Sequence, residues 1–159
     1  MTDGTELTHV RGDGAVHMVD VSAKEVTSRT AVAEGFVVST AEVVRLLAQG
    51  ELPKGEALGV ARIAGILGAK ATSTLIPLCH PLALDGVDID LEPHGDRVRI
   101  EARVRTSGRT GVEMEALTAV SVAALTVYDM IKAVDRGAVI TDIRVVAKAG
   151  GRSGEWSRS

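Results

Sequence analysis

The sequence predicts an α+β fold in which an antiparallel sheet carries helices on one face. Three observations support this expectation. Runs of alternating apolar and polar residues predict strands, apolar residues at helical spacing predict helices, and two strand-like runs flank a Pro-His-Gly turn that is typical of a β-hairpin. The 159 residues are enough for one domain of ordinary size.

The first half of the chain begins with an expected strand at residues 26–38, where side chains alternate between two faces. Ser39 and Glu42 form a capping-box pattern ahead of an apolar run that Gly50 ends, so a helix is expected between them. A second helix is expected at about residues 55–70. Three glycines lower its helix propensity, and we expect them to allow close packing against another backbone: Gly59, Gly65 and Gly68.

The second half continues with the hairpin, formed by residues 87–91 and 97–105. In its second strand arginines alternate with apolar residues, so one face of the sheet should carry a row of arginines toward water, a ligand or another subunit: Arg97, Arg99, Arg103 and Arg105. A long helix is expected at about residues 112–134, where Thr110 and Glu113 fit a capping box. A last strand is expected at residues 139–147.

The resulting order is one strand, two helices, two strands, one helix and one strand. This order is the split βαβ arrangement of a ferredoxin-like sandwich. We expect residues 1–16 to be a flexible lead-in, residues 17–149 to form a single α+β domain that carries the candidate catalytic residues, and residues 150–159 to be a flexible Gly/Ser/Arg tail.

Composition narrows the function classes. The net charge of −3 and a total of three aromatic residues argue against a nucleic-acid-binding surface. A single cysteine, Cys79, precludes an internal disulfide, and the four histidines lack the short spacings of metal ligands, so no metal is expected. The polar N-terminus and the lack of a long apolar run predict a cytoplasmic protein without a membrane segment.

Three groups of residues are candidates for chemistry, each with a plainer alternative. Asp129 and Lys132 lie one helical turn apart, which fits either an exposed ion pair or a proton-transfer pair. His80 lies between two prolines that stiffen its loop, which fits either a rigid turn or a fixed binding group. Glu113 and Glu115 fit either favourable charges at a helix N-terminus or ligand contacts.

Five segments together resemble one family, the cyclic pyranopterin monophosphate synthases of molybdenum cofactor biosynthesis. The resemblance runs from about residue 8 to residue 155. Its motifs are Met18-Val19-Asp20-Val21-Ser22-Ala23-Lys24, the loop from Pro77 to Leu82, Gly111-Val112-Glu113-Met114-Glu115-Ala116-Leu117-Thr118, Tyr128-Asp129-Met130-Ile131-Lys132-Ala133-Val134-Asp135, and Lys148 with Gly150-Gly151.

The resemblance implies a lyase reaction. The family converts (8S)-3′,8-cyclo-7,8-dihydroguanosine 5′-triphosphate, supplied by a radical enzyme that acts on GTP, to cyclic pyranopterin monophosphate with release of diphosphate. The resemblance further implies that no cofactor or metal is required. It implies a ferredoxin-like fold and a homohexamer, a trimer of dimers, with active sites at subunit interfaces.

The resemblance also assigns roles to individual residues. Asp129 corresponds to the catalytic acid/base, and Lys132 and Lys54 correspond to catalytic lysines. The substrate-binding positions are Leu78, Cys79, His80, Met114, Glu115, Glu113, Lys148 and Arg29. In the tail, Arg152 stands where lysine is common in the family, which keeps the charge but changes the donor geometry. A different class of function stays open: a ferredoxin-like regulatory module that binds a nucleotide or pterin without turnover.

Overall fold

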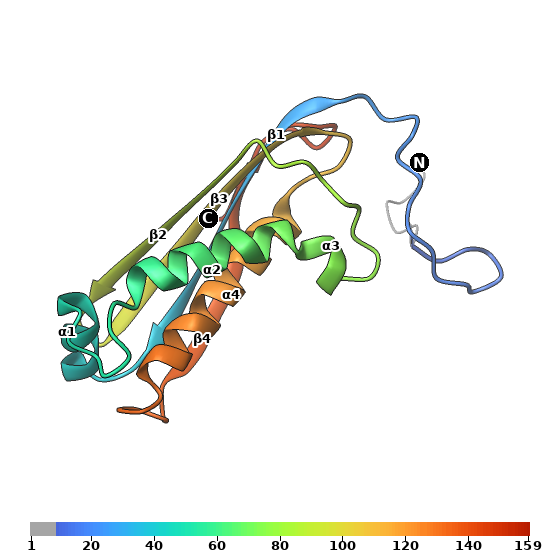
Figure 1. The fold of residues 1–159 in the computed structure, drawn as a ribbon. Coiled ribbons are helices and arrows are strands. Elements are labelled where there is room, and N and C mark those ends of the chain that lie inside the picture. Colours follow the sequence, from blue (N-terminus) through green and yellow to red (C-terminus); the bar gives the residue numbers. More distant parts are fainter. Residues whose placement is uncertain (1–8) are drawn as a thin grey trace.

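The computed structural model describes residues 9–159, so the first half of the expected lead-in, residues 1–8, lies outside the described part. The elements follow the predicted order, with a short helix and a short strand in addition (Figure 1). In chain order they are β1 (Thr27–Val38), α1 (Ala41–Gln49), α2 (Leu58–Lys70), α3 (Thr72–Leu75), β2 (Gly86–His94), β3 (Arg97–Gly108), α4 (Glu113–Ile131), β4 (Val139–Ala149) and β5 (Trp156–Ser157).

The sheet has the strand order β2-β3-β1-β4-β5, and every neighbouring pair is antiparallel. The first four strands have the ferredoxin-like order, in which β1 lies between β3 and β4. Helices α2 and α4 lie against one face of this sheet, as Figure 1 shows. The predicted α+β fold class is therefore confirmed.

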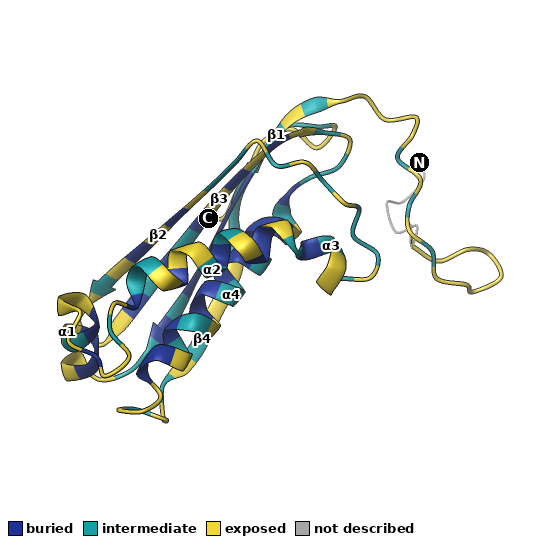
Figure 2. Ribbon diagram, in the orientation of Figure 1, coloured by how far each residue is buried: buried dark blue, intermediate teal, exposed yellow. Residues whose placement is uncertain are grey.

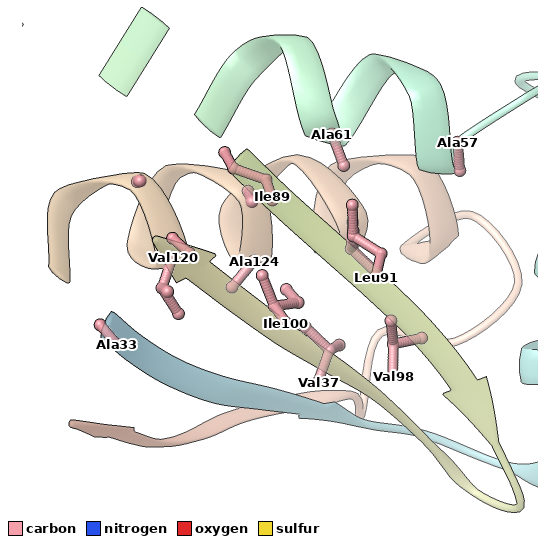
Figure 3. Packing of buried hydrophobic residues seen from close by; sticks show 14 of the residues in the cluster. Ala33, Val37, Ala57, Ala61, Ile89, Leu91, Val98, Ile100, Val120 and Ala124 are labelled. Atoms are coloured by element: carbon pink, nitrogen blue, oxygen red, sulfur yellow. The ribbon is translucent and has the colours of Figure 1, made fainter. Parts of the chain in front are cut away.

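The core lies between α4, α2 and the sheet and is built from small and branched aliphatic residues (Figure 3). In β3 the even-numbered residues Ile100, Ala102 and Val104 have no exposed surface, while the arginines between them face away from the helices. Figure 2 shows the same alternation as bands of buried and exposed ribbon. The arginines predicted on the open face are therefore found there.

Glycines allow α2 to lie close to α4, as predicted for two of the three. A Cβ on Gly65 would come within 3.0 Å of the Ala119 carbonyl oxygen, and one on Gly68 within 3.3 Å of the Thr118 carbonyl oxygen. Gly59 is different, because the atoms nearest to an added Cβ there belong to the Glu56 side chain. Its backbone N–H donates to the carboxylate of Glu56 at 2.8 Å, so it belongs to the start of α2.

Both predicted capping boxes were wrong. Helix α1 is capped by Thr40, whose Oγ1 accepts a hydrogen bond from the backbone N–H of Val43 at 3.2 Å. Ser39 instead donates to the Asp135 carboxylate at 2.5 Å, in the connection between α4 and β4. Helix α4 begins after Val112 without a side-chain cap. Pattern alone could not distinguish adjacent hydroxyl residues or foresee these long-range partners.

On the open face of the sheet, several arginines pair with acids. The carboxylate of Glu34 lies between Arg99 and Arg144, with N···O distances of 3.0 Å and 2.8 Å, and Arg105 pairs with Asp88 at 2.7 Å. The two guanidiniums lower the pKa of Glu34 although burial opposes this. The arginine row is thus partly neutralised by acids on neighbouring strands.

Part of the expected tail is paired with the sheet. Trp156 pairs with Lys148 as part of β5, so this segment is hydrogen-bonded at the sheet edge. The flexibility of the tail stays a prediction.

Within residues 9–159, α4 alone is long and apolar enough by length and composition to cross a membrane. More than half of it is buried against the sheet and α2, as in the core helix of a folded domain.

Candidate functional site

The three residues expected to be catalytic meet at the C-terminal end of α4. Asp129 Oδ1 accepts a hydrogen bond from Lys132 Nζ at 2.7 Å, and Asp129 Oδ2 accepts one from Lys54 Nζ at 2.9 Å. Lys132 follows one turn later on the helix, whereas Lys54 comes from the loop between α1 and α2. That loop turns at Gly55, whose φ of 89° is favourable only for glycine.

This carboxylate–lysine cluster is charged at neutral pH. The hydrogen bonds from Lys132 and then Lys54 lower the pKa of Asp129 to about 2, and Asp129 in turn raises the pKa of Lys132. All three side chains are substantially exposed to solvent. The cluster therefore presents two ammonium donors and one anionic acceptor on the surface, a set that can give and accept protons.

A second group of predicted residues lies at the opposite end of α4, around a cavity of about 290 Å³. The loop after α3 contributes Leu78, Cys79 and His80, and the first turn of α4 contributes Met114 and Glu115. The N-terminal segment closes another side of the cavity with Val19, Val21 and Lys24. Segments more than sixty residues apart in sequence thus form one pocket.

The pocket's histidine is held by a contact that the sequence did not reveal. His80 Nε2 donates to the backbone carbonyl of Val19 at 2.7 Å, which fixes the ring against the N-terminal segment. A second contact holds the same segment, because Arg109 Nε donates to the Lys24 carbonyl at 3.0 Å. These two bonds place Val19 and Lys24 over the pocket.

Glu115 is the buried acid of this pocket. Glu115 is only 4% exposed. Burial raises the pKa of its carboxyl, and the negative charge of Glu113 raises it further. Burial also raises the pKa of the Cys79 thiol, so the sulfur is held in its neutral form. This end of α4 thus offers a neutral thiol, an oriented imidazole and a carboxyl that is easier to protonate than usual.

The remaining predicted residues lie beside the pocket and carry positive charge. Lys148 Nζ pairs with the Glu113 carboxylate at 2.9 Å, and Arg29 donates to the Gly108 carbonyl at 3.0 Å. A neighbouring cavity of about 390 Å³ is lined by Arg29, Arg152 and also Lys24, which faces both cavities. Clustered cations next to a cavity suit an anionic ligand such as a phosphate chain.

The backbone that carries Lys148 into this region requires glycine. Gly150 and Gly151 have φ values of 96° and 72°, and a Cβ on Gly150 would collide with the Ser28 carbonyl oxygen. This turn brings the tail back across the end of β1. It explains in physical terms why Lys148 and Gly150-Gly151 occur together in the sequence.

A sequence model of the MoaC family matches residues 18–151. The chain belongs to the MoaC family. Similar proteins named cyclic pyranopterin monophosphate synthase occur in Corynebacterium efficiens (67% identical, covering 96% of this chain and 99% of that protein) and in Streptomyces coelicolor (64% identical, covering 96% and 90%). A protein of Mycobacterium tuberculosis named cyclic pyranopterin monophosphate synthase 2 is 61% identical over 96% of this chain and 92% of its own length.

In this member of the MoaC family, the predicted site residues form two groups that one chain keeps apart. Asp129 lies sixteen positions after Glu113, which corresponds to about 24 Å along α4 at 1.5 Å per residue. Sequence reasoning placed both groups in one site but omitted Lys24 from it. The motif at residues 18–24, which ends at Lys24, could have pointed to this lysine. No local sequence pattern, however, indicates that this segment covers the pocket.

Residues 9–159 contain no cluster of three or more histidine, cysteine, aspartate or glutamate side chains that could hold a metal ion. His80, Cys79 and Glu115 share a pocket, but the histidine nitrogen Nε2 is occupied by the Val19 carbonyl. The groups of the site that can take part in chemistry include carboxyl, ammonium, imidazole and guanidinium side chains.

Proposed function

We propose that this protein converts (8S)-3′,8-cyclo-7,8-dihydroguanosine 5′-triphosphate to cyclic pyranopterin monophosphate with release of diphosphate. It is then a lyase of molybdenum cofactor biosynthesis. Two findings support this reaction. The MoaC family model matches residues 18–151, and relatives similar over nearly the full length carry the name cyclic pyranopterin monophosphate synthase. The observation that carries it in the structure is the contact of Asp129 with both Lys132 and Lys54.

The geometry suits the proton transfers that the reaction needs. Opening the purine-derived ring and closing the pterin require protons to leave and join nitrogen and carbon atoms near neutral pH. Two lysines held by one carboxylate provide donors, and Asp129 stabilises whichever ammonium remains charged. We assign Asp129, Lys132 and Lys54 to this chemistry.

The pocket at the other end of α4 suits recognition of the substrate. Glu115 and Glu113 can accept hydrogen bonds from ring N–H and amino groups, and His80 is oriented for a polar contact. Leu78, Cys79 and Met114 supply the apolar wall. This division assigns the base-derived part of the substrate to the pocket.

The cationic cavity suits the triphosphate. When a hydroxyl of the substrate attacks the α-phosphorus, a new P–O bond forms, the hydroxyl proton is released, and the bond to diphosphate breaks. Lys148, Arg29 and Lys24 lie where they can offset the negative charge on the phosphates and on the leaving diphosphate. No cofactor or metal is assigned to this step.

We further propose that each active site is shared by two subunits of a homohexamer, a trimer of dimers. A substrate of nucleotide size cannot contact Glu115 and Asp129 of one chain at once, since more than 20 Å of helix lies between them, by the helical rise of about 1.5 Å per residue. A second copy can supply the missing half. The substrate would come from a radical enzyme that acts on GTP, in the cytoplasm.

Turnover tests this proposal directly. Purified protein is incubated with enzymatically prepared 3′,8-cyclo-dihydro-GTP, and diphosphate and pterin product are measured together, beside the Asp129→Ala variant. We expect the wild type to form both products. We expect the Asp129→Ala protein to form neither, while its oligomeric mass stays unchanged. Tight binding without either product from the folded wild type would instead favour the non-catalytic binding module.

A further inference from the structure

The motif from Tyr128 to Asp135 contains two polar residues to which the proposed reaction assigns no role. Asp129 and Lys132 of this motif form the carboxylate–lysine cluster with Lys54. The other two polar side chains, those of Tyr128 and Asp135, instead make hydrogen bonds to the chain around the end of α4. These bonds indicate that the two residues help to hold the cluster in place.

The turn after α4 determines where Lys132 lies. Helix α4 ends at Ile131, and Lys132 is its C-cap residue, so the lysine belongs to both the helix end and the turn. The backbone N–H of Asp135 donates to the Ile131 carbonyl at 2.9 Å, which folds the chain back directly after Lys132. Tyr128 closes the same turn, because its hydroxyl donates to the Arg136 carbonyl at 3.0 Å. The turn is therefore held from the last turn of the helix.

Both carboxylate oxygens of Asp135 accept hydrogen bonds from the chain itself. Oδ1 accepts one from the backbone N–H of Gly137 at 2.8 Å, and Oδ2 accepts one from the Ser39 hydroxyl at 2.5 Å. Asp135 and Ser39 are both half-buried. The first bond stays within the turn, whereas the second reaches a segment 96 residues away in sequence. The orientation of both oxygens toward the chain fits a positioning role and not a contact with substrate.

The partner of Asp135 lies in the segment that leads to the other lysine. Ser39 directly follows β1, and the next residue, Thr40, caps α1. Helix α1 in turn ends at the loop that carries Lys54. The backbone N–H of Ser39 also donates to the Asp96 carbonyl at 2.8 Å, which fixes Ser39 against the turn between β2 and β3. Figure 1 shows α1 and the orange turn after α4 at the same end of the sheet.

We infer that Asp135 is a positioning residue, whose hydrogen bond to Ser39 joins the two segments that carry the lysines of the cluster. This inference rests on the proposed function. Asp129 accepts one hydrogen bond from each of these segments, through Lys132 and Lys54. Ion pairs of long, exposed side chains are weak unless their geometry is fixed. A constant distance between the two backbones therefore lets one carboxylate hold both ammonium groups.

Removal of either side of the Ser39–Asp135 contact tests its role. Asp135→Ala and Ser39→Ala should each reduce kcat at least about 10-fold and leave KM within about 2-fold, because reacting groups are misplaced while the recognition pocket is untouched. The double variant should be no slower than Asp135→Ala alone, since both changes break the same bond. Ser39→Ala removes a single hydroxyl, so it tests the contact even if Asp135→Ala does not fold.

Two further variants separate positioning from a general loss of stability. Thr40→Ala removes the neighbouring hydroxyl, which caps α1, so it should destabilise the protein and leave kcat unchanged. Asp135→Asn should keep most of the wild-type turnover, because its amide oxygen can accept from Gly137 and its amide N–H can donate to the Ser39 hydroxyl. A Thr40→Ala protein as slow as Ser39→Ala, or an Asp135→Asn protein as slow as Asp135→Ala, would overturn the inference.

Titration of Asp129 keeps the two proposals apart, because it requires no substrate. Followed by NMR, the Asp129 pKa of about 2 should rise toward 3.8 in Asp135→Ala and Ser39→Ala, as the lysines are held less firmly, and should not change in Thr40→Ala. These shifts in a protein whose wild type forms no product would support the positioning role and remove the proposed reaction. An active wild type, with full turnover and an unchanged Asp129 titration in both alanine variants, would overturn this inference alone.

Discussion

The two ends of α4 hold acids in opposite environments. At the C-terminal end, Asp129 is exposed and ionised, because two lysines donate to it and lower its pKa. At the N-terminal end, Glu115 is buried, and its pKa is raised because burial penalises the carboxylate. The same helix therefore carries one acid suited to stabilising ammonium groups and one suited to holding a proton or a neutral hydrogen bond.

In the proposed reaction, we assign the two ends of α4 to separate steps. Proton transfer needs groups that exchange with water and with each other, which the exposed cluster provides. Recognition of a polar ring needs groups with fixed orientation and little competition from water, which the pocket provides. Four changes would sharpen or break this comparison.

The largest effect is expected when the lysine cluster loses its helical partner. Lys132→Ala should reduce kcat about 1,000-fold, within the range for removal of a general acid or base, and leave substrate KM nearly unchanged. Lys70→Ala, an exposed lysine at the end of α2, is the control and should retain full activity. Steady-state kinetics with the cyclised nucleotide measures both; a fully active Lys132→Ala enzyme would reduce the contact with Asp129 to a surface ion pair.

The next effect concerns the packing of α2 against the middle of α4, where Gly68 lies close to Val122 and Thr118. Gly68→Ala should lower the free energy of unfolding by about 2 kcal/mol, since the added Cβ would lie 2.8 Å from Val122 Cγ2 and crowd the Thr118 carbonyl. Gly59→Ala adds the same methyl group to the same helix, beside only the movable Glu56 side chain, and should be neutral or slightly stabilising. Urea unfolding of both variants measures the difference, and equal values would mean that the glycines do not set the helix spacing.

Much of this arrangement could be predicted from the sequence, because the strands and long helices follow local periodicity. The order of elements, the open arginine face and the close packing at Gly65 and Gly68 were all predicted from that signal. Asp129 and Lys132 were expected to touch because residues three apart share a helix face, and they do.

Features that depend on distant segments could not be predicted in the same way. The bond of Ser39 to Asp135 displaced the expected cap, and the bond of His80 to Val19 brought the N-terminal segment over the pocket. The family motifs placed all site residues in one site, but neither motifs nor periodicity measure the length of α4 between them. The separation of the two groups follows only from the structure.

A smaller effect is expected at the pocket end of α4. Glu115→Gln removes a carboxylate that burial disfavours, so the variant should be about 1 kcal/mol more stable than the wild type at neutral pH while turnover falls. A raised pKa means that the folded protein keeps its proton more readily than the unfolded chain. The stability difference should therefore be small below the ordinary carboxyl pKa of 4.5 and should open as the pH rises through it.

Thermal unfolding of the wild type and Glu115→Gln from pH 4 to pH 8 checks this dependence. Glu113→Gln is the matched control, since that carboxylate is more exposed and pairs with Lys148, and its loss should not stabilise the protein. A Glu115→Gln protein less stable than the wild type at pH 7 would indicate that the carboxylate makes favourable contacts that outweigh its burial.

The smallest expected change is in the titration of Asp129 itself. Its carboxyl should titrate with a pKa of about 2, because the hydrogen bonds from Lys132 and then Lys54 stabilise the anion. Lys132→Ala and Lys54→Ala should each raise this pKa toward the ordinary value of 3.8, the former by more, since Lys132 makes the larger contribution. Carboxyl carbon chemical shifts followed by NMR from pH 5 downward report it. Asp96, at the exposed β2–β3 turn, pairs with Arg97 and with neither lysine, and provides the internal reference. If both lysine variants left the Asp129 titration unchanged, the cluster would be too loosely held in solution to set the charge of its acid, and the contrast between the two ends of α4 would reduce to the burial of Glu115.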